Sequence, residues 1–259
     1  MAGINKNFQK LRDPNAKGLI WISTNLDEND VVRGGEEKLR SAVLYAEKEF
    51  RPEAIIVVNS CVPAIIGDDI DSILDDLQKQ VSARIVPIHC EGFKTKIMAS
   101  AYDAVYHGIL RNLLDKPEDF KKEIYEDEFE ILKEKYRKSR TVNILNVSSM
   151  SRQDEEELTR LVKALGLEVR IYPCYASADD FAYVDEAALN VSICATHDDY
   201  FVEHLKEKYG IPFVLRAIPI GIKNTSRWLL DIAKFFGLEE NAQRLIDAET
   251  KELLEALEP

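Results

Sequence analysis

The feature that most constrains this chain is its repeated alternation of short apolar strands with amphipathic helices. The segment Glu36–Phe50 has apolar residues at helical spacing, and the apolar run Ala54–Val58 after it is a predicted strand. A second predicted strand, Ile85–Ile88, begins the next unit of the same kind. These strands lack polar alternation, which is typical of strands covered on both faces. The pattern predicts an α/β protein with two Rossmann-like parallel-sheet domains and helices on both faces.

A charge-dense segment predicts where the two domains meet. Residues 115–140 mix both signs of charge, and apolar side chains recur every few positions, which indicates a solvated helical connector. We therefore predict a first, incomplete α/β domain with the connector at residues 1–138 and a second α/β domain at residues 139–259.

Several local expectations follow from turn and capping residues. We predict a short strand at Gly18–Ser23, a loop at Asn59–Pro63 and a short helix at Val184–Leu189. A helix is expected from Gly67 to about Val81, with Asp68 and Asp69 in its first turn. Those carboxylates favour the positive end of a helix, and we prefer this capping role over metal binding because nothing nearby completes a hard-metal site.

Composition excludes some classes of partner. The chain has 259 residues and a net charge of −12, which disfavours wrapping nucleic acid because phosphate binding needs a positive face. No run of about 18 apolar residues is present, so we expect no membrane span. The first residues lack an apolar signal core, and we expect a cytoplasmic protein.

The cysteines are the residues best suited to bind a metal or to act as nucleophiles. Cys61, Cys90, Cys174 and Cys194 are widely spaced, and in a reducing compartment disulfides are not expected. Each could simply be a small buried apolar residue. However, Cys61, Cys90 and Cys194 each follow a predicted strand, where open α/β sheets bind ligands. Thiolates grouped in this way suit soft metals and iron–sulfur clusters.

Other catalytic signatures are absent from the sequence. It contains no glycine-rich nucleotide-binding motif, no GxSxG nucleophile elbow and no HExxH zinc motif. His89 and His197 each lie close to a strand-end cysteine, but one cysteine and one histidine are too few ligands for zinc. A single catalytic thiolate stays possible, although no cysteine has an obvious His/Asn pairing along the chain.

Four blocks of sequence resemble one family. The block at Cys61-Val-Pro-Ala-Ile-Ile-Gly-Asp-Asp-Ile70 resembles the Cys-Pro-x-x-Leu-Ile-Gly-Asp-Asp-Ile motif of the nitrogenase component 1 family. The other blocks are Arg33-Gly-Gly-Glu-Glu-Lys-Leu39, Val86-Pro-Ile-His-Cys-Glu-Gly-Phe93, and Asn190-Val-Ser-Ile-Cys194 followed by a helix and Gly210-Ile-Pro-Phe213. Their order and spacing agree with the family over nearly the whole chain.

The resemblance implies roles for individual residues. It gives Cys61 the role of a ligand to an iron–sulfur cluster shared between two homologous subunits, and Cys194 that of a ligand to the metal cofactor. Cys90 corresponds to a cysteine that packs beside the cofactor region and is usually not a ligand. The helix after it would line the cofactor cavity, which implicates Met98 and Tyr102.

The same resemblance implies a function and partners. Low-potential electrons would come from an ATP-dependent iron–sulfur reductase, pass through the cluster at Cys61, and reach a nitrogenase-type metal cofactor at Cys194. A homologous β-type subunit would share the cluster. His197 and Tyr102 are the best candidates for contacts that tune the cofactor.

Departures from the family pattern leave alternatives open. Met98 and Tyr102 stand where dinitrogen-reducing subunits carry Gln and His, which argues against ordinary dinitrogen reduction. The family's first two cluster cysteines and its third domain have no counterpart here. Gly221-Ile-Lys-Asn-Thr-Ser226 is closer to the scaffold type. The alternatives are therefore a non-catalytic scaffold for cofactor assembly, or an interaction module that binds no cluster.

Overall fold

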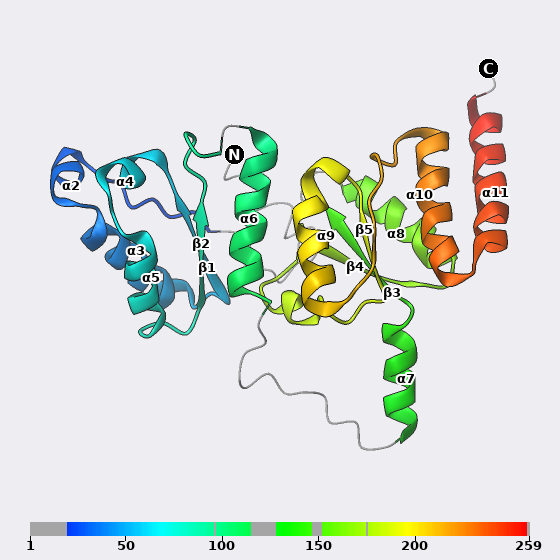
Figure 1. The fold of residues 1–259 in the computed structure, drawn as a ribbon, viewed down its shortest axis with the longest axis horizontal. Coiled ribbons are helices and arrows are strands. Elements are labelled where there is room, and N and C mark those ends of the chain that lie inside the picture. Colours follow the sequence, from blue (N-terminus) through cyan, green and yellow to red (C-terminus); the bar gives the residue numbers. More distant parts are fainter. Residues whose placement is uncertain (1–19, 96, 115–127, 147–151, 175, 258–259) are drawn as a thin grey trace. The chain divides into compact units, whose positions relative to one another are not determined.

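The computed structural model describes residues 20–95, 97–114, 128–146, 152–174 and 176–257. The chain divides into two compact units (Figure 1). Unit 1 comprises Met1–Leu113 with Ser177–Asp179, and unit 2 comprises Leu114–Ala176 with Asp180–Pro259. The predicted boundary between residues 138 and 139 stays a prediction.

Unit 1 contains two parallel strands, β1 (Ala54–Asn59) and β2 (Arg84–His89). The register pairs Ala54 with Arg84 and Asn59 with His89, so both strands end at the same level. This register matters for function because it brings the residues that follow Asn59 and His89 next to each other.

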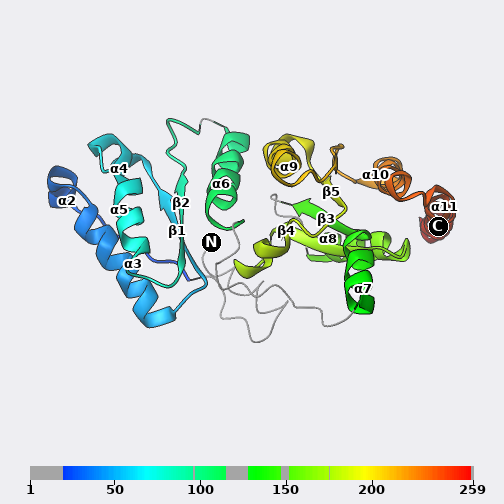
Figure 2. The ribbon, with the colours of Figure 1, turned by 60° about the horizontal axis from the view of Figure 1, so that its bottom comes forward.

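Helices cover both faces of these strands, as predicted. The described helices of unit 1 are α2 (Glu28–Arg33), α3 (Glu36–Phe50), α4 (Cys61–Ile66), α5 (Ile70–Gln78) and α6 (Met98–Asn112). Helices α3 and α5 lie on one face and α6 on the other (Figures 1 and 2). The core under α3 and α5 includes Val43, Leu74, Leu77 and Ile85. Burial of such apolar side chains is the main stabilising term of the unit.

Unit 2 contains a four-stranded parallel sheet in the order β4-β3-β5-β6. The strands are β3 (Thr141–Asn146), β4 (Glu168–Pro173), β5 (Leu189–Ser192) and β6 (Phe213–Val214). Parallel neighbours need crossover connections, and the intervening helices provide them. The parallel α/β architecture predicted from the sequence is confirmed.

Helices also lie on both faces of the sheet of unit 2. The described helices of this unit are α7 (Glu128–Lys138), α8 (Arg152–Ala164), α9 (Ala195–Tyr209), α10 (Gly221–Phe236) and α11 (Glu239–Leu257), and the 3₁₀ turn η1 (Asp179–Tyr183) begins with the last residue of unit 1. On one face Val142 and Val191 pack with Val162 of α8 and with Trp228 and Ile232 of α10. Helix α9 packs on β5 and β6 from the opposite face (Figure 2).

Several local expectations are wrong. Residues 20–23 of the predicted strand Gly18–Ser23 form no strand, and Ile20, Trp21 and Ile22 are 36%, 59% and 41% exposed. Helix α4 begins at Cys61, inside the predicted loop Asn59–Pro63. Residues 184–188 form turns and coil, and Leu189 begins β5, so the helix predicted at Val184–Leu189 is not formed. None of the described helices is long and apolar enough to cross a membrane.

Candidate functional site

The parallel register of unit 1 places Cys61 beside the loop that follows β2. Cys61 is the first residue of α4, two residues beyond the end of β1. The backbone N–H of Gly92 donates a hydrogen bond to the Cys61 Sγ at 3.2 Å. N–H donors of this kind tune the sulfurs of iron–sulfur clusters.

Cys90 lies in the same loop but has a different environment. It is partly buried, and its Sγ lies 3.9 Å from the Thr95 Oγ1, a distance within sulfur hydrogen-bonding range. The Gly92 amide, two residues later, is the group that reaches Cys61. This geometry gives Cys90 a packing role in its own loop, and any role toward a cofactor stays a prediction.

A buried carboxylate lies between the two strand ends. Glu91 is 1% exposed and accepts hydrogen bonds from Asn59 Nδ2 at 3.0 Å and Lys94 Nζ at 3.1 Å. Burial acts to raise the pKa of Glu91, but its own backbone amide, Lys94 and His89 together outweigh burial, and the pKa is lowered. Glu91 is therefore held as a carboxylate within the loop.

His89 joins this carboxylate to the surface of the unit. Its Nε2 lies 2.9 Å from Asp71 Oδ1, and its Nδ1 lies 3.6 Å from Glu91 Oε1. The carboxylates of Asp71 and Glu91 therefore face the two ring nitrogens of His89.

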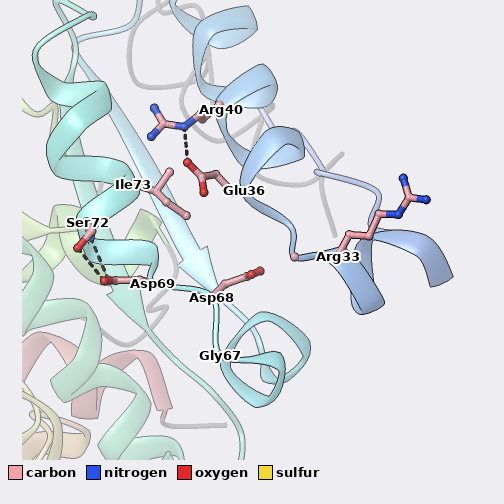
Figure 3. A pocket seen from close by; sticks show the side chains of 9 residues that line it. Arg33, Glu36, Arg40, Gly67, Asp68, Asp69, Ser72 and Ile73 are labelled. Atoms are coloured by element: carbon pink, nitrogen blue, oxygen red, sulfur yellow. Dashed lines mark hydrogen bonds and ion pairs between the residues drawn. The ribbon is translucent and has the colours of Figure 1, made fainter.

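The Gly-Asp-Asp segment has a structural role that joins α4, α5 and α3. Asp69 is the N-cap of α5 and accepts from Ser72 N at 3.1 Å. Asp68 precedes the helix, and both of its carboxylate oxygens accept from Gly35 N, at 3.2 and 3.0 Å. Figure 3 shows Asp69 turned toward Ser72 and Asp68 turned away from it. The helix predicted from Gly67 begins only at Ile70, because Gly67 ends α4, so neither aspartate lies in its first turn. The capping interpretation is right for Asp69, whereas Asp68 caps a different helix, α3.

A hollow lies beside this segment. Its volume is about 350 Å³, and it is lined by Arg33, Gly34, Glu36, Arg40, Gly67, Asp68, Asp69, Ser72 and Ile73 (Figure 3). Within it, Arg40 is paired with Glu36 at 2.8 Å and with Asp76 at 2.7 Å. The hollow contains none of the predicted cofactor ligands.

Met98 and Tyr102 lie on the first turns of α6. Met98 begins the helix and is 68% exposed, and Tyr102 is partly buried. One turn apart on a helix, the two side chains share a face. Nothing in the described contacts tests their predicted role at a cofactor.

Cys194 occupies the corresponding position in unit 2, at the end of β5. It is the N-cap residue of α9 and is 6% exposed. Its backbone N–H donates to Ser192 Oγ at 2.9 Å, and the Ser192 hydroxyl donates to the Asp198 carboxylate at 2.6 Å. Trp228 Nε1 donates to the Ser192 carbonyl oxygen at 3.2 Å. A buried polar network therefore fixes the backbone that carries this thiol.

His197 lies in the first turn of α9. Its backbone N–H donates to the Cys194 carbonyl oxygen at 3.0 Å, and the residue is partly buried. The structure thus brings Cys194 and His197 together within unit 2. It brings Cys61 and the Cys90 loop together within unit 1, the unit that also holds Met98 and Tyr102.

Sequence reasoning missed the polar residues that hold both cysteines. They are Asn59, Glu91 and Gly92 in unit 1, and Ser192 and Asp198 in unit 2. A polar residue at the end of an otherwise apolar strand, as at Asn59 of β1, is a signal that could have indicated the unit 1 residues.

The cysteines are the candidate ligands of a soft metal or cluster. The described residues contain no group of three or more His, Cys, Asp or Glu side chains able to hold a metal ion. Each cysteine therefore fits as a single thiolate ligand. Cys61 suits this role best, because its sulfur is partly accessible and already accepts a backbone N–H.

The fold and these thiols define a class of protein: a parallel α/β protein with cysteines at the ligand-binding ends of its strands. The chain belongs to the nitrogenase component 1 type oxidoreductase family, whose family model matches residues 4–259. The predicted family resemblance is confirmed.

Individual relatives are similar over most of this chain. The nitrogenase iron-molybdenum cofactor biosynthesis protein NifE of Rippkaea orientalis is 30% identical over 93% of this chain and 48% of its own length. The nitrogenase molybdenum-iron protein alpha chain of Methanosarcina barkeri is 26% identical over 90% of this chain and 41% of its own length. A solved structure titled "Nitrogenase Cp1 at pH 6.5" superimposes with a TM-score of 0.77 at 25% identity, over 93% of this chain and 45% of that one. This chain spans about half the length of these relatives.

Proposed function

We propose that this chain is an α-type subunit, or part of one, of a nitrogenase-like oxidoreductase, and that Cys61 supplies one thiolate ligand of an iron–sulfur cluster. The observation that carries the proposal is the 3.2 Å hydrogen bond from Gly92 N–H to the Cys61 sulfur at the carboxyl ends of β1 and β2. Open α/β sheets bind ligands at this end, and hydrogen bonds from N–H groups to the sulfurs are a feature of iron–sulfur sites.

We further propose that Cys194 holds a nitrogenase-type metal cofactor or its precursor. Its thiol is buried at the end of β5, on a backbone fixed by Ser192 and Asp198. When bound, the cluster would supply low-potential electron transfer and the cofactor would supply the site of substrate reduction. The chain's own residues would fix the thiols and exclude water.

The family resemblance also implies catalytic roles for Met98, Tyr102 and His197, and we propose these roles for this chain. His197 is close to Cys194 along α9, and Tyr102 offers a hydroxyl that can donate a hydrogen bond. Cys90 is assigned a packing role beside the cluster because its sulfur lies next to Thr95.

The single thiolate supplied by Cys61 implies a partner. A cluster needs several ligands, and the described residues of unit 1 offer no group of three. We propose a homologous β-type subunit that shares the cluster and an ATP-dependent iron–sulfur reductase that supplies electrons.

Anaerobic reconstitution with ferrous iron and sulfide tests the proposal. The chain would be co-purified with its β-type partner, and cluster iron would be quantified in wild type, Cys61→Ala and the matched control Cys90→Ala. We expect Cys61→Ala to lose the shared cluster and Cys90→Ala to retain it. Full cluster iron in Cys61→Ala would refute the role of Cys61.

A second candidate function is a non-catalytic scaffold for assembly of a nitrogenase-type cofactor. Its support is that relatives such as the Rippkaea orientalis protein carry the name of a cofactor biosynthesis protein. A scaffold would pass its metal cofactor to an acceptor protein without reducing substrate, whereas a reductase subunit would turn over substrate when the ATP-dependent reductase is added. A colourless, iron-free product after reconstitution would instead indicate an interaction module without a cluster.

A further inference from the structure

A buried bridge between the two strand ends of unit 1 lies directly behind Cys61. Asn59 is the last residue of β1, and its Nδ2 donates to Glu91 Oε1 at 3.0 Å. Asn59 is 6% exposed and Glu91 is 1% exposed. Two residues beyond Asn59 comes Cys61, and one residue beyond Glu91 comes Gly92, whose N–H reaches the Cys61 sulfur. The two hydrogen bonds therefore run side by side between the same two segments.

Glu91 also determines the conformation of the loop that carries Gly92. Its carbonyl oxygen accepts from Lys94 N at 2.8 Å, Thr95 N at 2.9 Å and Thr95 Oγ1 at 3.1 Å. Its carboxylate is meanwhile held by Asn59, with Lys94 and His89 facing it. A single residue thus folds the loop and attaches it to β1, which leaves little freedom in the direction of the Gly92 N–H.

Stability alone does not account for this bridge. Asn59 Oδ1 and Glu91 Oε2 are buried, and neither atom has a hydrogen-bond partner among the described residues. Buried polar atoms without partners are costly, and an apolar pair of similar volume is often at least as stable. The bridge therefore fits a role in positioning better than a role in holding the fold.

From this geometry we infer that Asn59 and Glu91 are positioning residues that aim the Gly92 N–H at the Cys61 sulfur. This inference rests on the proposed function, in which that sulfur is a cluster ligand. Loss of the bridge would release the loop, weaken the N–H···S hydrogen bond and change the electronic environment of the thiolate, while Cys61 itself stays in place on α4.

The direct test is hydrogen exchange at the Gly92 amide, measured by NMR on the 259-residue chain without metal. The variants are Asn59→Leu, which removes the donor, and Glu91→Gln, which keeps the shape and removes the charge. The matched control is Gln78→Leu. Gln78 bridges to Ala83 and Ile85 at the opposite end of β2, at 3.0 and 2.8 Å.

We expect Asn59→Leu to speed Gly92 exchange by tenfold or more relative to the amides of β2, and Glu91→Gln to speed it by a smaller factor. In Gln78→Leu the Gly92 amide should exchange as in wild type. Should Asn59→Leu fail to fold, Glu91→Gln decides the question. Unchanged Gly92 exchange in the folded variants, or an equal rise at every amide, would overturn the inference.

A second readout uses the reconstituted complex with its β-type partner. Asn59→Leu is expected to keep its cluster iron and to shift the reduction potential of the cluster, because an N–H donor to a ligating sulfur stabilises the reduced state. An unchanged potential in a variant with faster Gly92 exchange would overturn the tuning role. The positioning role of Asn59 and Glu91 can be refuted independently of the ligand role of Cys61. Gly92 exchange requires no metal, and the iron content of Cys61→Ala does not depend on Asn59.

Discussion

At the scale of single residues, the role of a carboxylate here depends on which backbone amide it reaches. Asp68 and Asp69 are neighbours in sequence, but Asp69 caps α5 while Asp68 accepts from Gly35, 33 residues earlier, at the start of α3. A carboxylate at the amino end of a helix interacts favourably with its dipole as well as with its free N–H groups. Asp68 therefore ties the Gly-Asp-Asp turn to a distant helix.

This contact gives a first prediction. Asp68→Ala should lower the free energy of unfolding by about 1 kcal/mol, because it removes the acceptor at the start of α3. Chemical denaturation would measure the loss. The control is Asp75→Ala on the exposed face of α5, which should change stability by less than about 0.5 kcal/mol. Equal effects of the two variants would contradict the capping role.

The residues behind Cys194 give a second prediction. Ser192 is fully buried, donates to Asp198 and accepts from Cys194 N. Ser192→Ala should lower the free energy of unfolding by about 1–3 kcal/mol, because it removes both bonds inside the core. Denaturation would be compared with that of Ser226→Ala, whose partly buried hydroxyl donates to the Ile222 carbonyl oxygen within α10. A loss no larger than that of the control would show that the network does not stabilise unit 2.

At the scale of elements, the packing of α6 on β2 depends on one glycine. A Cβ at Gly108 would lie 2.7 Å from the Pro87 carbonyl oxygen, and it would also meet Ile88 and Val86. Backbone cannot move aside as a flexible side chain can. The approach of α6 to β2 is therefore set by the lack of a side chain at Gly108.

Gly108→Ala is a third prediction. In an exposed helix this change would stabilise, but here crowding should dominate and lower stability by about 1–3 kcal/mol. Thermal or denaturant unfolding measures the effect, and Arg111→Ala, at an exposed position of the same helix, is the control. Increased stability of Gly108→Ala would show that the helix can shift to accommodate the methyl group.

Helix α4 shows why a local sequence pattern was misread. Pro63 predicted a loop, yet it is the third residue of α4, where the backbone N–H that proline lacks would have no partner within the helix. Gly67 ends the helix with a φ of +85°, a conformation that glycine adopts readily. Cys61 therefore begins a helix, where a loop was predicted.

At the scale of the whole molecule, charge holds together the outer part of unit 2. Glu186 pairs with Lys138 at 3.1 Å, Arg137 at 3.1 Å and Arg170 at 3.2 Å, and Glu134 pairs with Arg137. Burial acts to raise the pKa of Glu186, but the hydrogen bonds from Lys138 and Arg170 outweigh it and the pKa is lowered. Arg137 likewise lowers the pKa of Glu134.

This cluster gives a fourth prediction, on acid stability. A carboxyl whose pKa is lower in the folded chain stabilises the fold above its unfolded pKa, and that contribution is lost as the pH falls toward the folded pKa. The stability of unit 2 should thus fall as the pH drops below the ordinary glutamate range. Glu186→Gln should flatten this dependence in urea unfolding across that range, while Glu168→Gln, at an exposed position, should keep it. If the free energy of unfolding of Glu186→Gln depended on pH as steeply as that of wild type, the role of Glu186 in acid stability would be contradicted.

The sequence by itself determined the class of fold, the order of nearly all elements and the family. It did so because apolar periodicity and capping residues are local, and because the motifs around Cys61, Cys90 and Cys194 are contiguous. The helix at Glu36–Phe50 matches its predicted range for this reason.

Only the tertiary structure decided which groups surround each cysteine. Gly92 N–H meets Cys61, and Asn59 meets Glu91, because β1 and β2 are parallel and in register across some 30 intervening residues. No local sequence pattern predicts these two contacts, since hydrogen bonds between separate strands depend on how the whole sheet assembles. The sequence thus indicated the thiols, and the fold supplied the polar groups that orient them.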